Sequence, residues 1–114
     1  MTRERPAPPR PNVHRKPPRS FGWLDARLLH DGWLLELQPE AVAVMALLAI
    51  AADERGASYY LRETMVATLA LPRGKLDDCL ERLLDLGLVA HRPWSPGRAD
   101  GVWQLMPLPN RPRR

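Results

Sequence analysis

The sequence predicts a mainly α-helical domain that closes with a small β-hairpin and carries a disordered basic tail at each end. Apolar residues recur at helical spacing between residues 39 and 86, and two alternating apolar segments separated by turn residues follow them. Proline, lysine and arginine dominate both ends of the chain instead. A chain of 114 residues has room for one domain of ordinary size.

The two ends have the composition of disordered or polyproline II segments. Residues 1–20 contain six prolines, six Lys or Arg and one Glu, with Ala7 and Val13 as the only aliphatic side chains. Such a segment buries too little apolar area to offset the entropy that ordering would cost. Residues 107–114 have the same character, so we expect a tail at 1–20, a folded domain at 21–106 and a second tail at 107–114.

The positive charge of the protein belongs to these tails. The N-terminal tail carries +5 and the C-terminal tail +3, whereas residues 21–106, with eight Lys or Arg and twelve Asp or Glu, carry −4, which gives the overall +4. Basic tails on a small domain favour a polyanionic partner, most often nucleic acid. A solubilising or linker role is the alternative.

The segment 21–37 has the weakest pattern. Trp23, Leu24, Leu28 and Leu29 predict either a short strand or an irregular arm. The leucines between residues 34 and 37, which follow Asp31-Gly32, predict a short helical turn.

A central buried helix is expected from Pro39 to Gly56. Proline at the first helical position loses no hydrogen bond, and Glu40 suits the positive helix N-terminus. The helix is apolar nearly all round from residue 41 to 52, which is typical of a buried helix. This run of 12 residues is too short to span a bilayer.

A connector at 57–60 and two further helices follow. Helix 61–70 places Leu61, Met65, Val66 and Leu69 on one face, and the next helix runs from Pro72 to Leu86. Its expected inward side chains are Leu76, Cys79, Leu80, Leu83, Leu84 and Leu86. Residues 88–94 and 101–107 then form two strands around the turn residues 95–100.

The stretch LALPRGKLDDCLERLLDLGLV at 69–89 resembles the bacterial winged helix-turn-helix domains of transcription regulators and replication-initiator-like proteins. The similarity covers residues 38–106. It makes residues 58–70 the positioning helix, 72–75 the start of the recognition helix, 80–89 its close and 94–103 the wing. The left-handed conformation that glycine adopts easily lets Gly87 reverse the chain before the wing.

The resemblance implies a non-catalytic DNA-binding protein, either a regulator or an accessory factor of replication or mobile DNA, with double-stranded DNA as the partner. Arg73 and Lys75 are then the contacts to bases or phosphates. Backbone phosphates are the implied contacts of the remaining residues: Ser58, Tyr59 and Arg62 at the start of the positioning helix, and Arg92 and Arg98 on the wing.

The acids on the expected recognition helix depart from this pattern. Asp77 and Asp78, followed by Glu81, stand where a DNA-contacting helix gains nothing from negative charge. One explanation is a solvated helix face near the positive helix N-terminus. The alternative function is a protein-interaction module, an adaptor or homodimer, which uses these acids with Trp23 and Trp33 while only the tails contact nucleic acid.

The sequence offers no set of residues for catalysis. His14, His30 and His91 lack a second metal ligand at useful spacing, and no phosphate loop, dinucleotide fingerprint or nucleophile-base arrangement occurs. We therefore expect neither an enzyme nor a cofactor or metal.

The single cysteine, Cys79, fits a reducing compartment and a small buried side chain, with a reactive thiol as the alternative. The N-terminus has no apolar region of a secretion signal, so a cytoplasmic protein without a membrane partner is expected. Trp94 and Trp103 are expected to pack between wing and helices.

Overall fold

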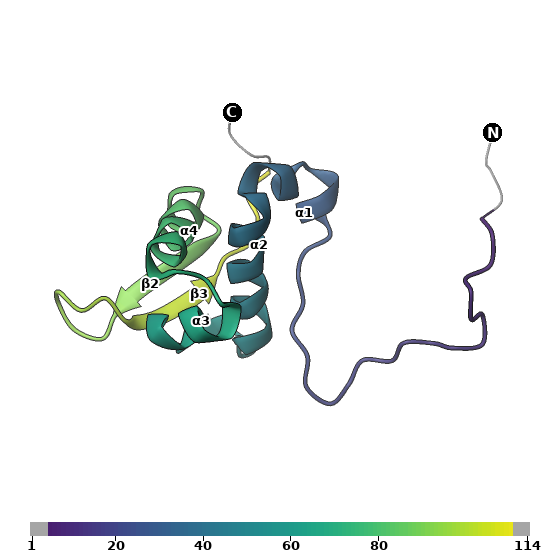
Figure 1. Cartoon of the computed structure of the whole chain (residues 1–114), viewed down its shortest axis with the longest axis horizontal. Helices are drawn as coiled ribbons and strands as arrows, with labels where there is room; N and C mark the ends of the chain where they lie inside the picture. The colour runs from purple at the N-terminus through teal and green to yellow at the C-terminus, as the bar shows by residue number, and fades with distance from the viewer. Residues whose placement is uncertain (1–4, 111–114) are drawn as a thin grey trace.

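The computed structural model describes residues 5–110 and contains four helices and a small antiparallel sheet (Figure 1). The elements in chain order are α1 Arg27–His30, α2 Trp33–Ala51, β1 Ala57–Ser58, α3 Arg62–Leu69, α4 Arg73–Asp85, β2 Val89–Pro93 and β3 Gly101–Leu105. The strand order is β1-β3-β2. A helix-rich fold with a small hairpin, as predicted, is therefore confirmed.

The central helix α2 consists of two helical stretches joined by a kink. Gln38 has a left-handed φ of 71°, and Pro39 begins the longer stretch, as the sequence predicts. The predicted helical turn before Pro39 is also present. The predicted end at Gly56 is wrong, because Ala52 is already extended and the Asp53 carboxylate accepts hydrogen bonds from the backbone N–H groups of Arg55 and Ala57. A side-chain turn of this kind replaces the last helical turn.

Two short elements differ from the expectation. Residues 27–30 form a helix rather than a strand or an irregular arm. The expected connector at 57–60 begins with strand β1, whose residues Ala57 and Ser58 pair with Gln104 and Trp103 of β3. A two-residue strand carries no periodic signal of its own, so only its pairing with β3 defines it.

The last long helix, α4, follows its predicted pattern closely. It buries Leu76, Cys79, Leu80 and Leu83, which share one face at helical spacing, whereas the predicted inward Leu84 is exposed. Gly87 ends the helix with φ +75°, and the N–H of Leu88 donates to the carbonyl of Leu83. This is the left-handed termination that the sequence predicts.

The hydrophobic core forms where α2 meets α4 and the sheet. Its largest fully buried side chains are Trp33, Trp103, Leu37, Leu48, Met65, Leu76, Leu80, Leu83, Leu88 and Val44. Each large apolar side chain that is fully buried contributes about 1.5–3 kcal/mol. By length and composition alone, α2 is also long and apolar enough to span a membrane. The inner face of α2, however, packs in this core. An apolar composition is therefore also what a central helix of a small domain requires.

The packed part of the chain extends beyond the predicted boundary at residue 106. Leu108 is buried in the core, and the N–H of Met106 donates to the carbonyl of Leu88. Residues 5–20 are exposed and contain no helix or strand. In chain order, the N-terminal segment starts away from the domain and then runs beside α2 before it reaches α1 (Figure 1). The outer parts of both expected tails, 1–4 and 111–114, lie outside the described residues.

Candidate nucleic-acid interface

The first turn of α4 presents two cations to solvent. α3 ends at Ala70, which has a left-handed φ of 54°, and Pro72 is extended and precedes the first helical residue. Arg73, Gly74 and Lys75 are exposed, and this turn contains no acid. The structure thus brings the two predicted base or phosphate contacts together at one exposed helix N-terminus.

Asp77, one of the acids that depart from the DNA-binding pattern, is paired with two arginines. Its Oδ1 accepts hydrogen bonds from the Nη1 of Arg62 at 3.3 Å and from the Nε of Arg73 at 3.2 Å. Two guanidinium groups and one carboxylate leave this cluster with a net charge of +1. The Arg73 side chain remains 54% exposed, and it uses Nε for this contact, so its terminal nitrogens remain available to a ligand.

Arg62 has a packing role that sequence reasoning missed. Its side chain is only 16% exposed, and its guanidinium carbon lies 5.3 Å from the centre of the Trp103 ring. The backbone N–H of Arg62 donates to the carboxylate of Asp100 at 3.0 Å. The residue predicted to contact phosphate therefore joins α3, α4 and the sheet, through a cation–π contact and an ion pair.

The prediction that Ser58 contacts a phosphate is wrong. It lies in β1 rather than at the start of a helix, and it is 1% exposed. The helix begins only at Arg62, because residues 57 and 58 are drawn into the sheet by pairing with β3. Tyr59, the neighbouring predicted contact, is exposed.

The remaining acids of α4 are open to solvent. Asp78 and Glu81 are exposed, and Asp78 lines a shallow groove of about 430 Å³ with Lys75 and Arg82. Arg82 crosses to α2, where its Nη2 donates to the backbone oxygen of Glu36 at 2.9 Å and lies 3.3 Å from the Glu36 carboxylate. The acidic face predicted for a protein partner is thus present at Asp78 and Glu81, while Asp77 is already paired.

The hairpin exposes the other two predicted DNA contacts, Arg92 and Arg98. Trp103 is fully buried, as predicted, but Trp94 is not packed between wing and helices. It is 52% exposed, and its ring is parallel to that of Tyr59, with 6.2 Å between the ring centres. Trp94 follows the last residue of β2 on the turn side, and its exposure places it outside the core between sheet and helices.

His91 lies against the inner side of the sheet and stacks on Trp103, with ring centres 4.0 Å apart. Burial lowers the pKa of His91, and the positive charge of Arg62 lowers it further, while Asp100 acts in the opposite direction. The buried Nε2 of His91 and Nε1 of Trp103 have no hydrogen-bond partner among the described residues. The neutral imidazole is therefore the form that this site accommodates.

The lowered pKa of His91 predicts acid-sensitive folding. Since the unfolded chain binds this proton more readily, the free energy of unfolding should decrease as pH falls below about 6.5, and level off below the folded pKa. Urea unfolding of the wild type and His91→Gln across this range measures the effect. The variant should show a smaller pH dependence, and His30→Gln, at an exposed position, is the control. Equal pH dependence in the wild type and His91→Gln would contradict the assignment.

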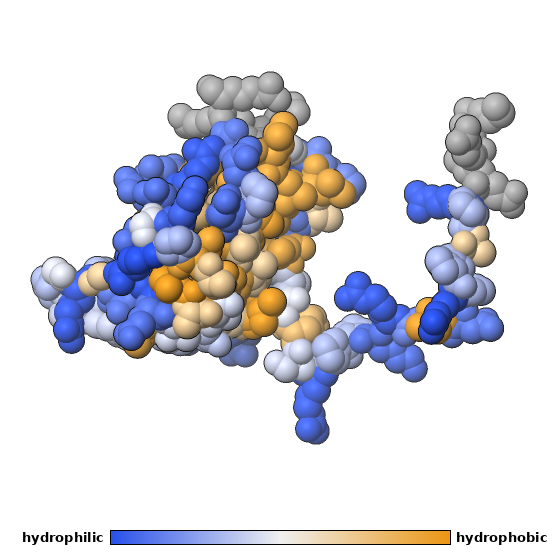
Figure 2. Space-filling view, in the orientation of Figure 1, coloured by the Kyte–Doolittle hydropathy of each residue, from blue (hydrophilic) through white to orange (hydrophobic). Residues whose placement is uncertain are grey.

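A second surface feature is an apolar groove of about 650 Å³ beside α2. It is bounded by the N-terminal segment 21–28, the end of α2 and the C-terminal segment up to Leu108. Its rim includes Trp23, which is 75% exposed, and Phe21, and Figure 2 shows hydrophobic side chains on the surface over α1 and α2. The prediction that Trp33 also belongs to an interface is wrong, because Trp33 is buried in the core.

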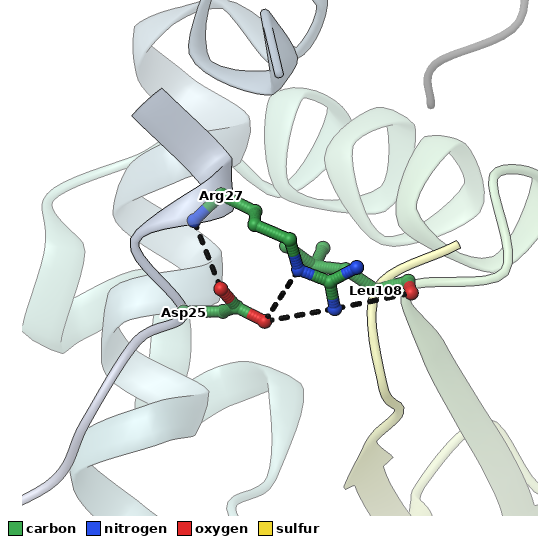
Figure 3. A network of polar contacts seen from close by, with 3 residues as sticks. All are labelled: Asp25, Arg27 and Leu108. Atoms are coloured by element: carbon green, nitrogen blue, oxygen red, sulfur yellow. Dashed lines mark hydrogen bonds and ion pairs between the residues drawn. The ribbon is translucent and has the colours of Figure 1, made fainter. Parts of the chain in front are cut away.

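A polar clamp of Asp25, Arg27 and Leu108, which all line this groove, is drawn in Figure 3. The Asp25 carboxylate accepts hydrogen bonds from the backbone N–H, Nε and Nη2 of Arg27, and the same Nη2 lies 3.5 Å from the backbone oxygen of Leu108. The side-chain hydrogen bonds from Arg27 hold the pKa of Asp25 below its ordinary value. The clamp links the N-terminal segment to the C-terminal end of the packed chain.

Groups that could hold a metal ion and the single thiol are the remaining candidate chemical features of residues 5–110. Within that range, no group of three or more His, Cys, Asp or Glu is placed to hold a metal ion. Cys79 is buried, and burial raises the pKa of its thiol, which disfavours the reactive thiolate. Comparison of the chain with protein-family models, with curated proteins and with solved structures found no match.

Proposed function

We propose that this chain is a non-catalytic, cytoplasmic DNA-binding protein of the winged helix-turn-helix kind, acting as a regulator or as an accessory factor of replication or mobile DNA. α2, α3 and α4, followed by the β2–β3 hairpin, occur in the order that the sequence resemblance implies. In this reading α4 is the recognition helix and the hairpin is the wing.

The observation that carries the proposal is the charge at the start of α4. Arg73 and Lys75 are exposed in a helical turn without acids, and Asp77 is compensated by Arg62 and Arg73. A helix N-terminus with exposed cations is suited to phosphates and base edges. Asp78 and Glu81 still weaken binding by α4, so the contact is expected to be shallow and confined to its first turn.

The N-terminal tail supplies the remaining affinity. The cations of residues 5–20 are all exposed, and they contact phosphates without reading sequence. Because the tail is attached to the domain, it raises the local concentration of α4 at the duplex. The tail therefore determines most of the affinity, and α4 with the hairpin determines the sequence preference.

Fluorescence anisotropy of the full chain with a random-sequence duplex, measured across a salt series, tests this division. Arg73→Ala and Lys75→Ala should each weaken binding and lower the salt slope by about 1, because each removes one phosphate contact. Arg55→Ala is the matched control, since this exposed arginine lies in the turn after α2. Replacing Arg10, Arg15, Lys16 and Arg19 with glutamine should lower the slope further.

The outcomes separate fold from tail. If only the tail variant loses affinity, and Arg73→Ala and Lys75→Ala bind like the wild type, α4 does not contact DNA and the proposal is overturned. Asp78→Lys gives the converse test at an exposed position that forms no ion pair with another residue between 5 and 110. It should strengthen duplex binding if α4 lies near phosphate.

The groove beside α2 favours a second candidate, a protein-interaction module. Its exposed Trp23 and Phe21 resemble the aromatic anchors of protein interfaces, and Asp78 with Glu81 would meet a basic partner surface. A second copy of the chain is the simplest partner. Sedimentation of the wild type and Trp23→Ser tests it: a dimer that Trp23→Ser dissociates supports this candidate, and a monomeric wild type excludes the homodimer.

A further inference from the structure

The face of the sheet that points away from the helices forms a separate surface. Side chains alternate between the two faces of a strand, and direct cross-strand partners share a face. Ser58, Trp103 and His91 form one cross-strand row, and its buried members place this row on the inner face. The next row, which contains Arg92 and its partner Val102, therefore lies on the outer face, and so does Tyr59, which follows Ser58.

An exposed aromatic pair lies at the hairpin end of this outer face. Tyr59 is 51% exposed and Trp94 is 52% exposed, yet their rings are held parallel, with an interplanar angle of 12°. A separation of 6.2 Å between ring centres is within the range of offset-stacked pairs, an arrangement that contributes about 0.5–1.5 kcal/mol beyond burial. The pair is thus a preorganised aromatic surface that leaves much of both rings open to solvent.

The surroundings of the pair are basic and sterically open. Arg92 lies on the same face, two residues before Trp94. Arg98 lies in the turn that follows Trp94, where its backbone N–H donates to the carbonyl of Ser95. Residues 86–99 contain no acid, and the Asp100 carboxylate is occupied by the backbone N–H of Arg62. The other outer-face positions of the sheet are small or polar, at Ala57, Ala90 and Gln104.

We propose that this outer face binds an unpaired nucleic-acid strand, with bases stacked on Tyr59 and Trp94 and phosphates held by Arg92 and Arg98. Exposed rings next to cations are the combination by which proteins hold single strands, because every base offers a flat π-face that paired DNA keeps inside the duplex. The inference goes beyond the proposed duplex binding and does not depend on α4. A protein that held both forms would act where a duplex is opened.

Binding of the full chain to a fluorescein-labelled oligothymidylate of about 12 nucleotides, measured across a salt series, tests the proposal. Affinities are compared at about 0.2 M salt, where contacts to the tails are strongly screened. Trp94→Leu and Tyr59→Leu should each weaken binding about tenfold, the effect of losing one base–aromatic stack, without changing the salt slope. Tyr59→Phe keeps the ring and should bind like the wild type. Arg92→Ala should lower the slope by about 1.

Trp23→Leu is the matched control, because Trp23 is the more exposed tryptophan and lies by the groove instead. Circular dichroism establishes that each variant is folded. The proposal is overturned if Trp94→Leu and Tyr59→Leu bind oligothymidylate as tightly as the wild type, or lose no more affinity than Trp23→Leu.

The two functions fail independently. Arg73→Ala should weaken duplex binding and leave oligothymidylate binding unchanged, whereas Trp94→Leu should weaken oligothymidylate binding by a larger factor than duplex binding. Single-strand binding that depends on Trp94, in a protein with no duplex affinity, supports this inference and contradicts the proposed function.

Discussion

Trp103→Ala is expected to lower the free energy of unfolding by about 3–5 kcal/mol, the usual cost of truncating a buried large aromatic side chain. Trp103 is fully buried in β3, carries the stacked ring of His91, and supports the guanidinium of Arg62. Its loss leaves a cavity and removes the ring that positions both neighbours. Because domains of this size are stable by only about 5–15 kcal/mol, the effect is a large part of the total.

Urea unfolding of the full chain, followed by far-ultraviolet circular dichroism, measures this loss. Trp94→Ala is the matched control, because its ring is half exposed and contacts Tyr59 at the surface. Its cost should be clearly smaller, because it loses only the aromatic pair, worth about 0.5–1.5 kcal/mol, and the burial of the covered part of the ring. Similar losses in the two variants would mean that Trp103 is not the centre of the core.

Gly101→Ala is expected to destabilise the hairpin by about 1–3 kcal/mol, as overpacking of a closely packed site does. A Cβ on Gly101 would meet the carbonyl oxygen of Arg92 and lie 2.6 Å from the Cα of Pro93. Both are backbone atoms of the neighbouring strand, so they move only if the β2–β3 pairing shifts. The requirement is steric, since Gly101 is not among the residues with positive φ.

Gly74→Ala provides the opposite control. A Cβ at Gly74 meets nothing within 4 Å, and the residue lies in α4, where alanine is favoured by about 0.5–1 kcal/mol. Urea unfolding should therefore show a stabilised Gly74→Ala and a destabilised Gly101→Ala. A Gly101→Ala protein as stable as the wild type would show that the strands separate at this end without cost.

The shift of β2 expected in Gly101→Ala should also affect the binding of nucleic acid. Trp94 follows β2 directly, and its N–H donates to the carbonyl of Asp100 at 3.0 Å. A shift of the hairpin at Gly101 therefore moves Trp94 relative to Tyr59. Gly101→Ala should weaken oligothymidylate binding more than duplex binding through Arg73.

The amino-acid sequence by itself determined the elements whose signals are local. The spacing of Leu76, Leu80 and Leu83 predicts α4 and its buried face, and Gly87 predicts its left-handed end. Alternation and turn residues predict both strands of the hairpin in the same way. These signals suffice because the helix and the turn depend on residues within a few positions of one another.

Only the tertiary structure decided the roles of residues whose partners are distant in the chain. Ser58 is buried because it pairs with β3, which lies more than forty residues later in the sequence, and no pattern near Ser58 predicts a strand there. Arg62 and Asp77 have opposite charges that suggest opposite roles toward DNA, yet the packing of α3 against α4 joins them in one ion pair. Tyr59 and Trp94 become a surface only through the sheet register. Local propensity specifies elements, whereas long-range contacts specify which side chains meet, and binding sites are made of side chains that meet.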